Sequence, residues 1–332
     1  MNTKSSILTA ISLFAFAIPS LSYAQKICVF DPAGTQGDNY SLMKDYALAA
    51  KQWGAEVILK PYVNDQKATD DFKDGKCDAL SSIGYRIRQF NNFTGSIDSF
   101  GLIPSDGIAR SMLGLMANPR LASEMVSGNN EIVGVSPFGI LYPMTNDRNI
   151  NTMAKMVGKR FGILDFDDTQ KITVEKLGGI PVGTSLSAIG TLFNAGKLDL
   201  IFLPAYAYQA LDISKGMGTH GAIARYPVAF ITVQIVVRRD KFPEGYGAKS
   251  RTWVAGQLDR QFKNNKRLED TIDNSLWEEL PDADKKGYDR ILREVRIGFQ
   301  RQGVYSKKMA SIAKKMRCSK DSSNYECSQN DE

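Results

Sequence analysis

Over residues 158–211, short apolar runs typical of strands alternate with segments whose apolar residues have helical spacing. Residues 159–164 and 180–182 are short apolar runs typical of strands, and residues 200–203 are apolar enough for a strand buried on both faces. Between the last two runs, residues 185–194 carry apolar side chains three and four positions apart, which is the spacing of one helix face. Strands separated by helices in this order predict a parallel sheet in an α/β fold.

The first half of the chain repeats this order. Residues 26–30, 56–61 and 77–82 are predicted strands, and amphipathic segments lie between them. The stretch 72–79 also parallels 193–200, because each runs from a phenylalanine through Gly-Lys to an aspartate. The repeat predicts two lobes, each a parallel-dominated sheet flanked by helices.

Two extended segments, 133–145 and 227–239, are predicted to connect the lobes as the hinges of a clamshell. The predicted divisions are a signal peptide at 1–24, lobe I at 25–145, lobe II at 146–235, C-terminal helices returning to lobe I at 236–317, and a polar tail at 318–332. We expect the tail to be mobile outside any disulfide that it forms.

Three motifs in the second half occur in a recognisable order. They are Gly-Lys-Arg-Phe at 158–161, Leu-Gly-Gly-Ile-Pro-Val at 177–182 and Asn-Ala-Gly-Lys-Leu-Asp at 194–199. This order resembles periplasmic solute-binding proteins of the TRAP (DctP-like) type over roughly residues 40–240. The chain is more similar still to AdeT-like putative solute-binding proteins. The resemblance implies a two-lobed periplasmic binding protein that captures a small polar solute between its lobes and delivers it to integral-membrane transporter subunits, of TRAP or ABC type.

One position departs from the TRAP pattern. In that family an arginine near the end of the Gly-Lys strand forms a two-pronged salt bridge with the ligand carboxylate, but Gly162 stands at this place here. Arg160 lies two residues earlier, on the same strand face. The departure puts organic-acid binding in doubt and leaves the fold expectation unchanged.

The ligand site is predicted from topology, because open parallel sheets bind ligands at the carboxyl ends of their strands. Aromatic rings with a few directional polar groups suit a small polar solute. Each of these side chains, taken singly, is also compatible with packing or helix capping. The predicted ligand-binding residues are Asp31, Tyr85, Arg86, Arg160, Asp165, Phe166, Tyr206, Tyr208 and Gln209.

The charges at these strand ends point in two directions. Asp31, Asp165 and Asp167 stand near tyrosines, and carboxylates beside aromatic faces suit an ammonium group. Arg86 and Arg160 favour an anion. On balance the sequence favours an amino-bearing or zwitterionic solute.

The first 24 residues have the layout of a secretory signal. Lys4 supplies the basic region, residues 7–21 the apolar core, and residues 22–24 a small-x-small cleavage site. The alternative is a membrane anchor, which the short apolar run and its Pro19 disfavour. We therefore expect export to the periplasm.

Four cysteines in an exported chain suggest two disulfides, for which three pairings are possible. Cys28 and Cys77 lie near the starts of two strands that are neighbours in a sheet ordered 2-1-3, and Cys318 and Cys327 are close in sequence. We prefer these two pairs. A thiolate metal site is disfavoured because no C-x-x-C pair occurs, and no cofactor is predicted.

Charge and motifs restrict the other function classes. Much of the formal net charge of +6 comes from residues 307–317, where the lysines are most simply the solvated face of a helix, so no nucleic-acid partner is predicted. His220 is the single histidine and no G-x-S-x-G motif occurs, so we do not predict an enzyme. A monomer is expected. The alternative function is a periplasmic accessory protein of a drug-efflux system, although no heptad coiled-coil hairpin is visible.

Overall fold

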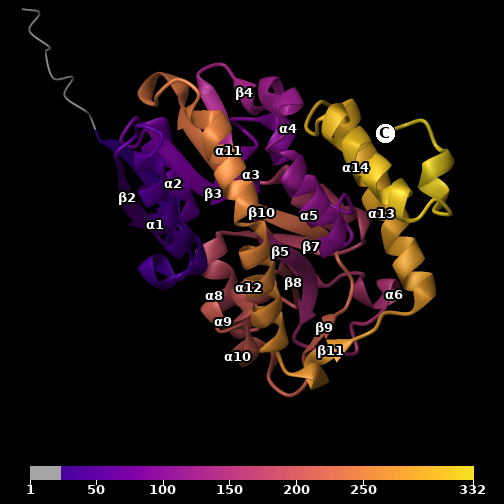
Figure 1. The fold of residues 1–332 in the computed structure, drawn as a ribbon. Coiled ribbons are helices and arrows are strands. Elements are labelled where there is room, and N and C mark those ends of the chain that lie inside the picture. Colours follow the sequence, from indigo (N-terminus) through magenta and orange to yellow (C-terminus); the bar gives the residue numbers. More distant parts are fainter. Residues whose placement is uncertain (1–23) are drawn as a thin grey trace, which may run out of the picture.

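A computed structural model describes residues 24–332, and the predicted signal segment lies outside the described residues except for Ala24. The connected strands run in the order β2-β1-β3-β10-β5-β8-β6-β7, with helices on both faces (Figure 1). The strands are β1 (Gln25–Phe30), β2 (Val57–Tyr62), β3 (Ala79–Ile83), β4 (Val126–Ser127), β5 (Asn130–Thr145), β6 (Arg160–Leu164), β7 (Ile180–Thr184), β8 (Leu200–Leu203), β9 (Ala222–Ala224), β10 (Ala229–Arg238) and β11 (Trp277–Glu278).

Helices fill the connections between these strands. The apolar face predicted for residues 185–194 is confirmed, since Ile189 and Phe193 of α8 are buried. The helices are α1 (Asp38–Lys51), α2 (Asp65–Lys73), α3 (Gly84–Ile87), α4 (Asn92–Gly95), α5 (Asp106–Leu115), α6 (Met153–Met156), α7 (Asp168–Lys176), α8 (Leu186–Asn194), α9 (Ala205–Ala210), α10 (Ile213–Met217), α11 (Tyr246–Gly256), α12 (Leu258–Asp270), α13 (Asp282–Arg301) and α14 (Lys307–Lys320).

The sheet divides into two lobes. In the first, β1 pairs in parallel with β2 and β3, which confirms the predicted order 2-1-3. In the second, β6 pairs in parallel with β7 and β8. β10 and β5 are antiparallel to their neighbours in the first lobe. The fold class is therefore α/β and two-lobed, as the sequence predicts.

β5 belongs to both lobes. Residues 130–141 pair with β10, whereas residues 142–145 pair with β8. Gly139, near the end of the first part, has a φ of +136°, which favours glycine, and the register against β10 shifts beside it. All ten residues of β10 pair within the first lobe, so the sequence-based boundary at 235 falls inside this strand.

The C-terminal helices cover both lobes rather than the first alone. α14 packs against α4 and α5 of the first lobe, but α13 packs against α6 and α7 of the second. The Tyr288 hydroxyl of α13 contacts Met156 Sδ at 3.0 Å. α12 contacts α5, α9 and β5, and so it also touches both lobes.

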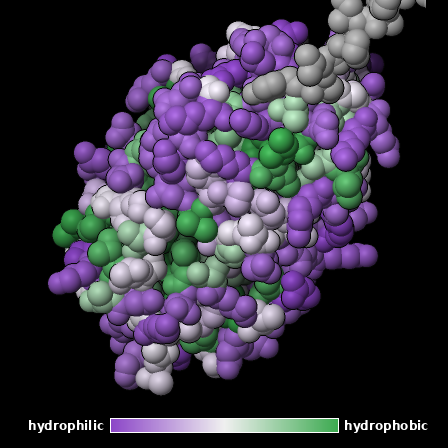
Figure 2. Space-filling model, turned by 90° about the vertical axis from the view of Figure 1, so that its left-hand side faces the viewer, coloured by the Kyte–Doolittle hydropathy of each residue, from purple (hydrophilic) through white to green (hydrophobic). Residues whose placement is uncertain are grey.

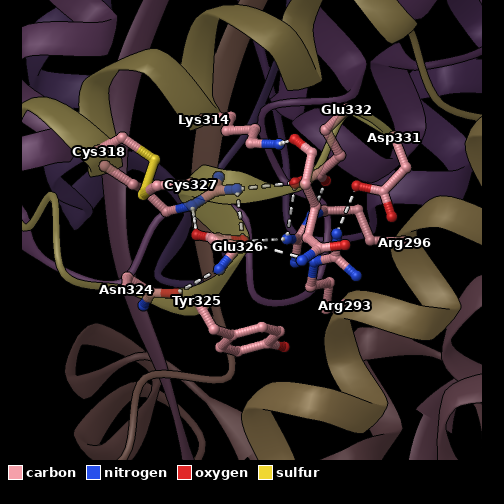
Figure 3. A network of polar contacts seen from close by, with 12 residues as sticks. Arg293, Arg296, Lys314, Cys318, Asn324, Tyr325, Glu326, Cys327, Asp331 and Glu332 are labelled. Carbon is pink, nitrogen blue, oxygen red and sulfur yellow. Dashed lines mark hydrogen bonds and ion pairs between the residues drawn. A yellow bond between two sulfur atoms is a disulfide. The ribbon is translucent and has the colours of Figure 1, made fainter.

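Both predicted disulfides are present, Cys28–Cys77 and Cys318–Cys327. The second closes a loop in the polar tail, and this tail is ordered beyond the disulfide (Figure 3). The side chain of Glu332 is fully buried and accepts hydrogen bonds from Arg296. The expected mobility of the tail is therefore wrong, because buried arginines provide partners that the sequence pattern does not reveal.

The surface mixes polar and apolar residues. On the face shown in Figure 2, hydrophilic residues predominate and apolar residues form separate patches among them. Exposed apolar side chains scattered singly are ordinary on a protein surface. The large exposed ones are Leu48, Ile58, Val63, Val157, Ile180 and Tyr325.

Candidate functional site

The carboxyl ends of β1 and β3 meet those of β6 and β8 at a seam between the lobes. Asp31, directly after β1, accepts a hydrogen bond from the hydroxyl of Tyr206 in α9, at 2.6 Å. The Asp31 side chain also accepts from the backbone N–H groups of Ala33 and Tyr40. Burial raises the pKa of Asp31, and the hydrogen bond from Tyr206 partly offsets this effect. Two predicted site residues from different lobes are thus joined directly.

Arg86 makes a second contact across the seam. Its Nε donates to Asp65 Oδ2 at 2.5 Å within the first lobe, and both side chains are buried. Its guanidinium lies over the ring of Phe166 from the second lobe, 3.2 Å from the ring centroid. The charge of Arg86 is therefore already balanced by Asp65, while its flat face holds the second lobe.

Arg88 and Asp167 form a third contact across the seam, at 3.4 Å between Nη1 and Oδ1. The other two atoms of this pair, Arg88 Nη2 and Asp167 Oδ2, are buried without a hydrogen-bond partner, as are the hydroxyls of Tyr85 and Tyr305. Burial raises the pKa of both tyrosines, that of Tyr305 to about 12. Four buried polar atoms without partners in one place are unusual in a folded protein.

A cavity of about 470 Å³ opens beside this pair, and we call it the arginine groove. Residues of both lobes line it, including three cationic side chains and one carboxylate. They are Gln66, Lys73, Tyr85, Arg86, Arg88, Gln89, Phe166 and Asp167.

Asp98 lies beneath this cluster and is fully buried. It accepts hydrogen bonds from the backbone N–H and the hydroxyl of Thr232, at 3.2 and 2.6 Å. Burial raises the pKa of Asp98 to about 7, while these hydrogen bonds and the charge of Arg88 oppose the rise. The negative charge of Asp167 also raises the pKa of Asp98 and so favours the protonated form of Asp98.

Asp98→Asn is expected to change how stability depends on pH. A carboxyl group whose pKa is higher in the folded than in the unfolded state favours folding at low pH, and this contribution is lost as pH rises toward the folded value. Between about pH 4 and pH 7, Asp98 alone should lower the free energy of unfolding by about 1.4 kcal/mol per pH unit. Urea denaturation at several pH values should give slopes that differ by this amount between the wild type and Asp98→Asn, and equal slopes would contradict the prediction.

The middle of the seam holds a central cavity of about 40 Å³ with mostly apolar walls. Gly162, the residue that the sequence pattern matches to the TRAP arginine, is among its lining residues. A Cβ atom at Gly162 would lie 2.7 Å from Leu198 Cδ1 and 3.0 Å from Ile201 Cγ2. Apolar packing therefore leaves no room for an arginine side chain at position 162.

The far end of the seam holds a third cavity, of about 410 Å³, which we call the amide cavity. Both polar atoms of the Gln261 side chain and Asn265 Nδ2 are buried there without a partner. Tyr206 and Phe138 line it too, and Phe138 also lines the central cavity. The three cavities thus follow one seam.

The remaining predicted site residues lie elsewhere. Arg160 is at the starting end of β6, where it pairs with Asp199 at 2.5 Å. Asp165 is exposed, Gln209 is exposed and donates to Thr271, and Tyr208 packs partly buried in the second lobe's core. None of the four predicted residues lines the three cavities described above.

Several residues of the seam were not predicted from the sequence. Arg88, Asp98 and Tyr305 belong to the cluster, and Gln261 and Asn265 belong to the amide cavity. Arg88 lies two residues after Arg86, so a search over the whole turn after β3 would have included it. The other residues come from segments that the strand-end rule does not cover.

The family model for "Solute-binding protein AdeT 1/2" matches residues 47–332. The chain belongs to this family. Among the curated relatives of this AdeT-family chain is a probable solute-binding protein AdeT1 of Acinetobacter baumannii, 41% identical over 304 residues, which are 92% of this chain and all of the relative. A probable solute-binding protein AdeT2 of the same organism is 26% identical over 235 residues, 70% of this chain and 98% of the relative.

Solved structures share the fold of this AdeT-family chain. A TRAP periplasmic solute-binding protein from Desulfovibrio salexigens with bound orotic acid has a TM-score of 0.72 at 15% identity, covering 90% of this chain and 99% of that one. One from Haemophilus influenzae with bound L-gulonate has a TM-score of 0.73 at 11% identity, covering 88% and 99%. These identities support the shared fold alone.

Membrane-spanning helices and metal-binding clusters would indicate other functions. Over residues 24–332, no helix combines the length and the apolar character that a bilayer crossing requires. Nor do the described residues contain three or more His, Cys, Asp or Glu side chains grouped so as to hold a metal ion.

Proposed function

We propose that this AdeT-family protein is a periplasmic receptor that takes up a small polar solute in the seam and delivers it to integral-membrane transporter subunits. The observation that carries the proposal is the cluster of buried polar atoms without partners around Arg88 and Asp167, which come from different lobes. A solute held there would supply the missing hydrogen bonds and join the lobes.

Several observations support export and solute capture. The layout of residues 1–24 is that of a secretory signal, and two disulfides are typical of proteins in an oxidising compartment. The neighbours of known structure hold orotic acid and L-gulonate, which are small polar molecules. We propose that the protein acts as a monomer and that the seam binds its solute without chemical change. The histidine His220 is exposed on a loop outside the seam.

The test is native mass spectrometry of the mature protein purified gently from periplasm, compared with a denatured sample. A small-molecule adduct in one-to-one ratio that disappears on denaturation is the expected result. The unfolding temperature is then measured with organic acids, amino acids and polyamines. Absence of any adduct and of any stabilisation across the three classes would contradict the proposal and favour the efflux-accessory function. The small volume of the central cavity would then support a protein that binds no solute.

Tyr206→Phe is expected to weaken solute binding about tenfold or more. The hydrogen bond from Tyr206 to the Asp31 carboxylate joins the lobes, and hydrogen bonds to charged groups contribute about 1.5–3 kcal/mol. Asp31 keeps its two backbone donors, so the first lobe should remain folded. Isothermal titration with the co-purified solute measures the affinity, and small-angle scattering should show a larger radius of gyration. Tyr208→Phe, on the same helix, is the matched control, and equal affinity of both variants would contradict the prediction.

A further inference from the structure

We infer that the arginine groove takes a zwitterionic solute, whose carboxylate binds Arg88 and whose ammonium group binds Asp167. The inference rests on the proposed function and specifies its solute class. It assigns the two charged groups to different lobes, since Arg88 follows α3 in the first lobe and Asp167 precedes α7 in the second. A solute with both charges would therefore hold the two lobes together.

The contact between Arg88 and Asp167 leaves half of each group unused. Only Nη1 and Oδ1 meet, at 3.4 Å, which is long for an ion pair between buried groups. Asp167 Oδ1 also accepts from the backbone N–H and hydroxyl of Thr169, so this oxygen serves as the helix cap. Arg88 Nη2 and Asp167 Oδ2 remain without partners, one a donor and the other an acceptor. A solute with both an acceptor and a donor would satisfy these two atoms.

The Arg88–Asp167 pair disfavours a solute with a single charge. An anion at Arg88 would leave Asp167 buried and facing a like charge, and a cation at Asp167 would do the same to Arg88, each at a cost of several kcal/mol. Arg86 compensates neither solute, because its own charge is taken up by Asp65. A zwitterion replaces both halves of the existing pair and leaves neither Arg88 nor Asp167 uncompensated. Lys73, the third cation that lines the groove, is exposed to solvent.

Two tyrosines complete the carboxylate end. The guanidinium carbon of Arg88 lies 5.3 Å from the ring centroid of Tyr85 and 5.0 Å from that of Tyr305, so the two rings flank it. Both hydroxyls are buried without partners and are protonated at neutral pH, since burial raises the pKa of each. A carboxylate at Arg88 Nη2 would accept hydrogen bonds from them.

The central cavity indicates the rest of the solute. Tyr85 lines both this cavity and the arginine groove, so the two spaces adjoin. The central cavity measures about 40 Å³ and its walls are mostly aliphatic and aromatic, with Leu164 and Phe202 among them. It suits a small apolar substituent and not a charged one. The inferred solute is therefore an α-amino acid, or a close relative, with a small apolar side chain.

The test compares solutes that differ by one charged group. The unliganded mature protein is titrated by calorimetry with each of the twenty amino acids, with isovalerate and isobutylamine as analogues of valine that lack one charge, and with orotate and gulonate as anions. We expect an amino acid with a small apolar side chain to bind, and isovalerate and isobutylamine to bind at least tenfold more weakly than valine. An anion or an amine that binds more tightly than every amino acid would overturn the inference and leave the proposed function intact. No binding by any probe would overturn both.

Two variants assign the charges. Asp167→Asn keeps the oxygen that caps α7 and loses the negative charge, and Arg88→Gln loses the positive charge. Each should weaken binding of the amino acid at least tenfold. Arg160→Gln, on the outer face of the second lobe, is the matched control and should bind as the wild type does. Wild-type affinity in both Asp167→Asn and Arg88→Gln, with unfolding temperatures that show intact folding, would overturn the inference.

Discussion

Arg296→Met is expected to lower the free energy of unfolding by about 3–5 kcal/mol, because it removes one of the two arginines that pair with two buried carboxylates. The Arg296 side chain is 2% exposed and pairs with Glu326 and Glu332, which are 8% and 0% exposed (Figure 3). Arg296 Nη1 also donates to the carbonyl oxygen of Phe100, so the guanidinium fixes the tail to the first lobe.

The electrostatics of Glu332 support this size of effect. Burial opposes ionisation of Glu332, but Arg296 and Arg317 outweigh burial and lower its pKa to about 2. Without Arg296, the carboxylates keep Arg317 as their close cationic partner, and Arg293 lies 3.9 Å from Glu326. Urea denaturation at pH 7, followed by circular dichroism, measures the loss.

Arg301→Met is the control for this prediction. Arg301 lies in the last turn of the same helix, α13, and its side chain is exposed. Its replacement should change the free energy of unfolding by less than about 0.5 kcal/mol. If Arg296→Met and Arg301→Met were equally stable, the buried network would not hold the tail as described.

Removal of the Cys28–Cys77 disulfide, through Cys28→Ala and Cys77→Ala together, should destabilise the protein by about 4 kcal/mol. The bond joins residues 49 positions apart, and restriction of the unfolded chain grows with the length of the closed loop. Both residues are buried, so alanine introduces no polar atom into the core. Denaturation of the wild type and the double variant under oxidising conditions measures the difference.

The second disulfide provides the comparison. Cys318 and Cys327 are 9 positions apart, and the same loop-length relation gives about 2.5 kcal/mol for removal of this bond. The variant without Cys28–Cys77 should therefore be the less stable of the two. If the variant without Cys318–Cys327 were the less stable of the two, the contribution of this bond to holding the tail in place would be larger than the difference in unfolded-chain entropy between the two loops.

Strand order and disulfide pairing were predictable because both follow from local pattern and sheet geometry. Apolar runs separated by amphipathic helices led to the order 2-1-3, and this order placed Cys28 beside Cys77. The pairing of Asp31 with Tyr206 shows that the strand-end rule also brings residues of the two lobes to one seam. The same rule predicted both Arg86 and Arg160 as site residues, but only Arg86 contacts the other lobe. Arg160 lies at the starting end of β6, away from the seam, although it shares a strand face with Gly162.

The rest of the site depends on contacts between segments that are distant in sequence. Tyr305 reaches the cluster from the connection between α13 and α14, and Asp98 from the region after α4. No periodicity or motif relates these positions to Arg88. The burial of Glu332 is unpredictable for the same reason, since its two partners, Arg296 and Arg317, come from different helices, α13 and α14.

The glycine at position 162 has a consequence for the evolution of ligand preference. A single codon change can create an arginine there, but the new side chain would meet Leu198, Ile201 and Ile189 within 3.2 Å of its first carbon. Overpacking of this kind is itself destabilising. Smaller residues around position 162 would therefore have to come before an arginine there, so carboxylate binding by an arginine at this position requires several ordered substitutions.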